Sequence, residues 1–171
     1  GGSAHRDISS LGGILDRWIA GGDEKFDVMT QYGFIEDWDL SQVTDMKYLL
    51  YDRLTFNEDL SKWDVSNVTN MHFLFKGCAS FIGDISKWNV SKTKNMANMF
   101  ESASKFNGDL SKWTTSSLSN MYRMFQFASI FNGNLSNWDV SSVFSMGSLF
   151  YNAFDFNGDL SKWVTSNLNR M

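Results

Sequence analysis

Bulky apolar residues recur along this chain with a constant spacing of 25 positions. Phenylalanine, tryptophan and methionine each occupy one position per 25-residue unit, without a single insertion. A unit of this kind cannot bury its apolar face alone, so the units must stack against one another. The period therefore predicts a repeat protein whose core is made of columns of like side chains. The columns are Phe56, Phe81, Phe106, Phe131 and Phe156; Trp38, Trp63, Trp88, Trp113, Trp138 and Trp163; and Met46, Met71, Met96, Met121, Met146 and Met171.

The apolar spacing within each unit predicts two short elements. Residues 60–68 follow the pattern L-x-x-W-x-V-x-x-V, which is close to that of leucine-rich repeats. The alternation around Trp63 and Val65 indicates a strand with both side chains inward, and residues 57–59 mark a turn. Apolar residues near helical spacing over 71–79 predict a short helix or 3-10 turn. We therefore expect a β-rich, leucine-rich-repeat-like solenoid with a parallel sheet.

The first 33 residues lack the repeat and predict a helical cap. Five apolar residues follow helical spacing, so we expect an amphipathic helix whose start is capped by Ser9 or Ser10 and which ends at Gly21-Gly22. A second short helix is expected over 23–31. The five residues are Leu11, Ile14, Leu15, Trp18 and Ile19. We divide the chain into a tag remnant or disordered lead (1–7), a helical cap (8–33) and about six repeats (34–171), the last incomplete.

Composition narrows the class of protein further. Proline is absent, as expected where stacked backbone positions need their N–H groups. The single cysteine, Cys78, excludes an internal disulfide, and no apolar run is long enough to span a membrane. A net charge of −4 without clustered basic residues argues against a nucleic-acid-binding protein.

The repeat resembles that of a known family. Phe-Asn-Gly-Asp-Leu-Ser-Lys-Trp followed by Asp-Val-Ser-Asn-Val-Thr-Asn-Met is similar to the BspA-like surface-protein repeat over residues 34–171, and residues 18–39 resemble the lead-in of such arrays. The resemblance implies a leucine-rich-repeat-like solenoid at the cell surface or outside the cell, associated with adhesion or protein binding. It supplies no catalytic residue.

Two polar columns flank the expected strand and are expected to point outward. Their side chains either keep the sheet soluble or contact a partner. If they contact a partner, specificity should come from the positions that depart from the repeat, such as Thr114, Asn137 and Val164. The candidate partner-binding residues are Lys62, Lys87, Lys112, Asn137, Lys162, Asp39, Asp64 and Asp139.

The remaining polar and aromatic columns have structural explanations. One carboxylate per coil in the column from Asp59 to Asp159 is too few for calcium, which takes about 6 to 8 oxygen ligands, so turn capping is favoured. The tryptophan column is more consistent with a core than with a sugar platform, and the two serine columns with hydrogen bonds at turns. His5, His72 and Cys78 form no zinc or nucleophile motif. We expect no metal, no cofactor and no enzymatic activity.

The function expected from the sequence is a non-enzymatic binding or adhesion module that presents its repeated face to a protein or glycan partner. The alternative is a structural protein that stacks end to end, because no capping segment follows the last repeat in this sequence. Open ends of repeat stacks expose edges that favour self-association.

Overall fold

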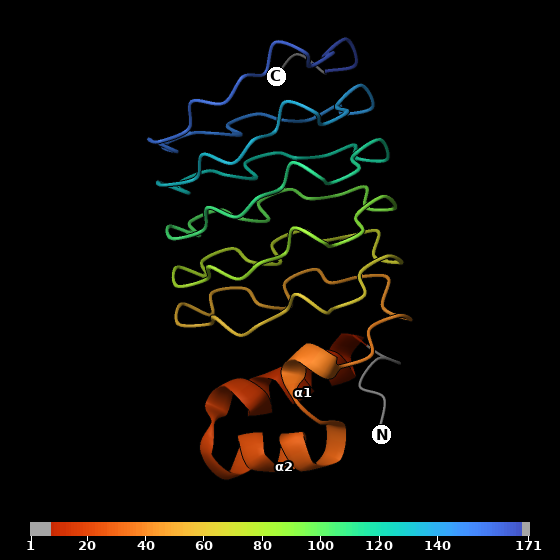
Figure 1. Cartoon of the computed structure of the whole chain (residues 1–171), viewed down its shortest axis with the longest axis vertical. Helices are drawn as coiled ribbons and strands as arrows, with labels where there is room; N and C mark the ends of the chain where they lie inside the picture. The colour runs from red at the N-terminus through yellow and green to blue at the C-terminus, as the bar shows by residue number, and fades with distance from the viewer. Residues whose placement is uncertain (1–7, 169–171) are drawn as a thin grey trace.

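The computed structural model describes residues 8–168 and shows coils of chain stacked on a pair of helices (Figure 1). The helices are α1 (Ile8–Ala20) and α2 (Gly22–Tyr32), followed by the short 3-10 helix η1 (Ile35–Asp37). The coils then rise one above another, and the C-terminal end lies opposite the helices. The expected tag remnant, residues 1–7, lies outside the described residues.

The two helices cap the first coil, as predicted. α1 buries Leu11, Leu15 and Trp18, and the Trp18 ring meets that of Trp38 edge to face at 5.6 Å. The chain turns between the helices at Gly21, whose φ of 77° suits glycine. α1 begins at Ile8, so Ser9 and Ser10 lie within the helix and the prediction that one of them precedes it is wrong.

The expected β-rich, leucine-rich-repeat-like solenoid is also wrong. Residues 8–168 contain no strand and no sheet, and only isolated parallel bridges connect successive coils. In the expected strand, Trp63 and Val65 are both buried as predicted. However, the Trp63 N–H donates to the Leu60 carbonyl at 3.1 Å and the Val68 N–H to the Val65 carbonyl at 2.9 Å. Two four-residue β-turns, 60–63 and 65–68, replace the extended chain, and they coincide with L-x-x-W and V-x-x-V.

The helix or 3-10 turn expected over 71–79 does not form either. Phe73 and Gly77 have φ values of 60° and 74°, and left-handed residues interrupt a right-handed helix. Alternate N–H groups cross to the next coil instead: that of Met71 donates to the Asn95 carbonyl at 2.8 Å and that of Phe73 to the Ala97 carbonyl at 3.1 Å. We call this side the ladder face. It comprises residues 46–53 and their equivalents in every later coil.

The opposite side of each coil is built from tight turns, and we call it the turn face. It comprises residues 57–68 and their equivalents 25 positions before and after. Between the two faces lies the predicted core of stacked rings. Phe75, Phe100, Phe125 and Phe150 stack with centroid separations of 5.5, 5.6 and 5.7 Å. Each such pair contributes about 0.5–1.5 kcal/mol beyond its buried area.

Candidate binding surfaces

The tryptophans on the turn face connect one coil to another through their indole groups. The Nε1 of Trp63 donates to the Ile35 carbonyl at 2.7 Å, and that of Trp113 donates to the Ile85 carbonyl at 3.1 Å. Both rings are only 3% exposed. The column is therefore core, as predicted, and does not form a platform on which sugars stack.

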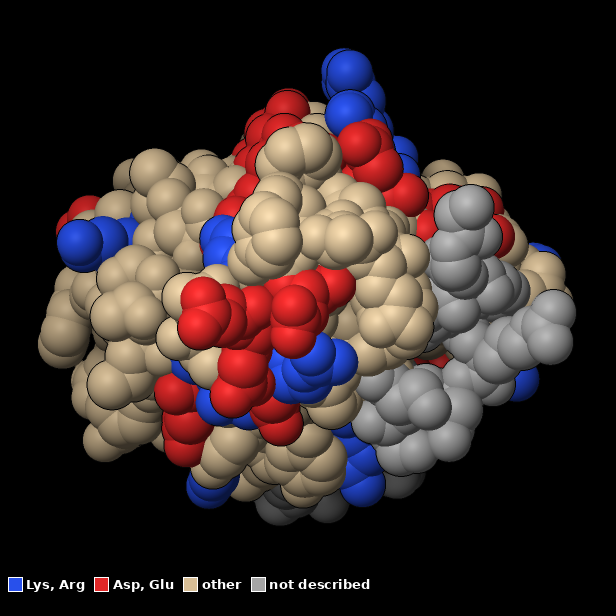
Figure 2. Space-filling model, turned by 90° about the horizontal axis from the view of Figure 1, so that it is seen from below, with Lys and Arg blue, Asp and Glu red and all other residues tan. Residues whose placement is uncertain are grey.

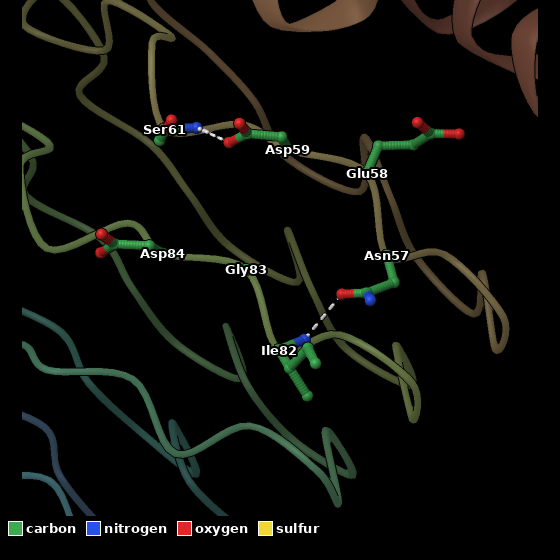
Figure 3. A pocket seen from close by; sticks show the side chains of 7 residues that line it. All are labelled: Asn57, Glu58, Asp59, Ser61, Ile82, Gly83 and Asp84. Atoms are coloured by element: carbon green, nitrogen blue, oxygen red, sulfur yellow. Dashed lines mark hydrogen bonds between the residues drawn. The ribbon is translucent and has the colours of Figure 1, made fainter.

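The aspartates at the start of each turn bond to backbone N–H groups. Asp59 Oδ1 accepts the Ser61 N–H at 2.9 Å (Figure 3), and Asn134 accepts the Ser136 N–H at the same distance. The Ser61 backbone and hydroxyl hydrogen bonds lower the pKa of Asp59. The turn-capping role predicted for this column is confirmed, and asparagine performs it without charge.

An open hollow of about 410 Å³ lies between two of these turns (Figure 3). Asn57 accepts the Ile82 N–H at 2.9 Å across the hollow, and Glu58 points away and accepts a hydrogen bond from Lys25 at 3.0 Å. Its polar side chains are thus already bonded within the fold. Among residues 8–168, no group of three or more histidine, cysteine, aspartate or glutamate side chains is arranged to hold a metal ion.

All eight candidate residues from the sequence are exposed on the turn face. The three candidate aspartates are engaged in folding: the Ser41 N–H donates to Asp39, the Ser66 N–H to Asp64 and the Ser141 N–H to Asp139, each at 3.0 Å. The structure therefore brings the lysine and aspartate columns together but leaves mainly the lysines available to a partner.

The lysines of the column differ in what surrounds them. Lys62 donates to Asp37 at 2.7 Å, and this hydrogen bond raises the pKa of Lys62. Lys87 and Lys112 form no ion pair with a carboxylate in the described part of the chain. The column thus changes from a paired to an unpaired lysine between its first and second members.

A partly exposed group of aromatic residues on the ladder face was not anticipated from the sequence. The rings of Tyr48 and Phe73 stack at 4.7 Å, His72 stacks on Phe73 at 3.9 Å, and Tyr51 meets Phe73 edge to face at 5.9 Å. Tyr48 is 47% exposed and Tyr51 is 38% exposed. We call these four residues the aromatic cluster.

Two lysines border the aromatic cluster. The Nζ of Lys47 lies 5.0 Å from the centre of the Tyr48 ring, and the Nζ of Lys76 lies 5.0 Å from that of Phe73. Lys76 also pairs with Glu101 at 3.1 Å. Burial lowers the pKa of His72, which favours the neutral imidazole. The cluster is therefore an uncharged aromatic surface with ammonium groups at its edge.

The backbone at two members of the aromatic cluster is in a conformation that bulky residues disfavour. Tyr48 and Phe73 have φ values of 61° and 60°, and the left-handed region costs a side chain about 1–2 kcal/mol. Asn98, Arg123 and Ser148 occupy the same position in later coils. The fold does not require aromatic side chains there. The available sequence signal was this lack of repetition, which the helix expected over 71–79 obscured.

Comparison with known proteins identifies the family but no activity. Residues 23–128 and 94–171 match the family described as "Mycoplasma protein of unknown function, DUF285", and the chain belongs to this family. The family match does not support the leucine-rich-repeat-like solenoid expected from the sequence, which the structure also contradicts. No curated protein and no solved structure matches the chain.

The helices were also compared with the requirements for crossing a bilayer. Within residues 8–168, neither α1 nor α2 combines the length and the apolar character that a membrane span needs.

Proposed function

We propose that this chain is a non-enzymatic binding or adhesion module that holds its partner on the ladder face, outside the cell or at its surface. The observation that carries the proposal is the partly exposed aromatic cluster, which includes two positions where the fold does not need aromatic residues. Tyr48 and Phe73 are disfavoured there by their left-handed backbone, and Tyr48 is also 47% exposed to water. The left-handed backbone recurs in later coils with other residues, so folding explains the conformation but not the choice of aromatic side chains.

A protein partner fits the composition of the aromatic cluster best. Tyrosine and phenylalanine are enriched at protein interfaces, and tyrosine is frequent among the residues that dominate binding energy. Each aromatic ring can bury about 150–250 Å², so the four rings form a suitable apolar centre for a contact of about 800 Å² per partner. Lys47 provides a charged rim. The cell-surface location follows the resemblance to BspA-like repeats.

The proposal is tested by finding a ligand and asking whether the aromatic cluster binds it. The intact protein is screened against a displayed peptide library and a glycan array, and each ligand is measured again with the double variant Tyr48→Asn/Phe73→Asn. Asparagine tolerates the left-handed region, so the double variant keeps its fold, which its melting temperature verifies. We expect binding to weaken at least tenfold.

A matched control comes from another exposed ring. Phe154 is 77% exposed in a distant coil, so Phe154→Ser removes apolar surface without touching the aromatic cluster and should leave binding unchanged. Ligands that bind the double variant as tightly as the wild type would contradict the proposal, as would the absence of any ligand in both screens.

A further inference from the structure

A second pocket, of about 360 Å³, lies on the turn face between two neighbouring coils. Lys87 and Lys112 line it, one from each coil, with Asn89 and Thr114 beside them and Trp88 forming part of the wall. Its volume falls near the lower end of the range for small-ligand sites, roughly 300–1,000 Å³. No carboxylate lines it.

The pocket lacks carboxylates because two residues depart from the repeat. The positions of Asn89 and Thr114 are taken by aspartate in the coils of Asp64 and Asp139. Asn89 still accepts the Ser91 N–H at 3.1 Å, so the turn keeps its cap while the negative charge is lost. At position 89, folding therefore does not account for the missing charge.

The same two coils place unpaired lysines in register. Lys62 is paired because the residue 25 positions earlier is Asp37, whereas the residue 25 positions before Lys87 is Lys62 and that before Lys112 is Lys87. Like charges in register repel one another. The nearby Asp84 and Asp109 carboxylates accept the backbone N–H groups of Ser86 and Ser111, each at 2.9 Å, and form no ion pair with these lysines. A bound anion would relieve this repulsion.

We propose that this pocket binds a sugar unit that carries a carboxylate, with Lys87 and Lys112 holding the carboxylate and Asn89 and Thr114 bonding to the ring hydroxyls. This site goes beyond the proposed function, because it lies on the other face of the stack. Neutral amide and hydroxyl groups beside the lysines suit a ligand with one charge and several hydroxyls better than a string of charges.

The charge of the rest of the molecule also favours a small ligand with a single charge. The net charge is −4, and acidic side chains gather at the end formed by the helices (Figure 2), where Asp23 and Glu24 lie in the first turn of α2. A polyanion or a strongly acidic protein surface would be repelled by this field. A single sugar carboxylate needs only the local positive charge of the pocket.

The test is a titration of the protein with three probes, followed by nuclear magnetic resonance and by tryptophan fluorescence, because Trp88 lines the pocket. Glucuronate carries both the ring and the single charge, glucose only the ring, and the α-amide of N-acetylglutamate only a single peptide-like carboxylate. We expect saturable glucuronate binding that is at least tenfold tighter than that of either other probe.

Variants locate the binding. Lys87→Gln/Lys112→Gln should weaken glucuronate binding at least tenfold, and Lys162→Gln, in the same column of a distant coil, should not. Thr114→Asp restores the carboxylate that other coils carry at this position, so it should fold normally and also weaken binding at least tenfold.

Three outcomes would overturn the sugar site: no saturation, equal binding of the α-amide of N-acetylglutamate, which would indicate an acidic peptide site, or unchanged binding in Thr114→Asp. None of these outcomes bears on the ladder face, because Tyr48 and Phe73 take no part in the pocket.

Discussion

The ladder face and the turn face hold the same coils together by different means. On the ladder face, backbone N–H groups donate directly to carbonyls of the next coil, as Tyr48 does to His72 at 3.0 Å. On the turn face, side chains make the connection, as the Trp88 indole does to the Leu60 carbonyl at 3.0 Å. Where the backbone makes the contacts, the outward side chains are free to differ. Where side chains make them, the same residue must recur in each coil.

This difference explains where the coils agree and where they disagree. The stretch F-N-G-D-L-S-K-W recurs on the turn face because its phenylalanine, aspartate and tryptophan build each coil. The first of the two left-handed positions of the ladder face holds five different residues: Tyr48, Phe73, Asn98, Arg123 and Ser148. A surface that can vary without loss of the fold is the surface on which binding specificity can develop.

The largest expected effect comes from changing the register that both faces share. Deleting residues 82–106 removes one 25-residue period, so the ladder and the ring columns realign, and we expect a less stable protein that still unfolds cooperatively. Deleting residues 82–93 places the two faces out of register and should abolish cooperative thermal unfolding and the near-ultraviolet circular dichroism signal. If both deletions behaved alike, the coil register would not control folding.

A single side chain on the turn face should matter more than one on the ladder face. Trp113→Phe leaves the buried Ile85 carbonyl without its indole donor and should lower the free energy of unfolding by at least about 2 kcal/mol. Phe127→Asn also removes a ring, but Phe127 is 42% exposed and left-handed, so we expect a change below about 1 kcal/mol. Urea denaturation measures both, and equal losses would contradict the comparison.

Backbone strain should be detectable only on the ladder face. Ser148 has a φ of 54°, so Ser148→Gly should raise the free energy of unfolding by about 0.5 kcal/mol as the left-handed strain is relieved. Ser142, which is exposed on the turn face and is not left-handed, serves as the control. Ser142→Gly should lower stability by about 0.5 kcal/mol. Shifts of the same sign would contradict the prediction.

The smallest effect concerns acid and belongs to the turn face. Hydrogen bonds from the serines two residues on lower the pKa values of Asp59, Asp84 and Asp109 from 3.8. The stability they add is therefore present above pH 3.8 and is lost as the pH falls through the lowered values. The triple variant with asparagine at these positions should keep its turns and lose less of its melting temperature in acid. Parallel curves for both proteins would contradict this.

Sequence reasoning succeeded where a single coil already contains the cause. The columns of Phe100 and Trp113, the two N-terminal helices and the capping by Asp59 follow from apolar period and turn chemistry. It failed where the backbone path depends on neighbouring coils. The apolar spacing of consecutive β-turns around Trp63 resembles that of a strand, and left-handed residues such as Phe73 cannot be recognised from residue type.

The candidate sites show the same division. The sequence indicated the exposed lysine column that includes Lys87 and Lys112, because those residues recur in period. It could not indicate that Lys62 is paired with Asp37 while the later lysines are not, since that depends on which residue lies one coil below. The aromatic cluster was missed because its members do not repeat.

The sequence by itself determined the 25-residue period, the ring columns of the core and the cap, because every unit has to bury the same apolar side chains. Only the tertiary structure decided that the coils consist of turns rather than strands, and which side chains face outward. Each backbone N–H can donate to a carbonyl of its own coil or to one of the next coil, and which of the two it bonds to depends on how the coils stack. The positions of Tyr48 and Phe73 on the ladder face, and the pocket between Lys87 and Lys112, follow from this pairing of backbone groups.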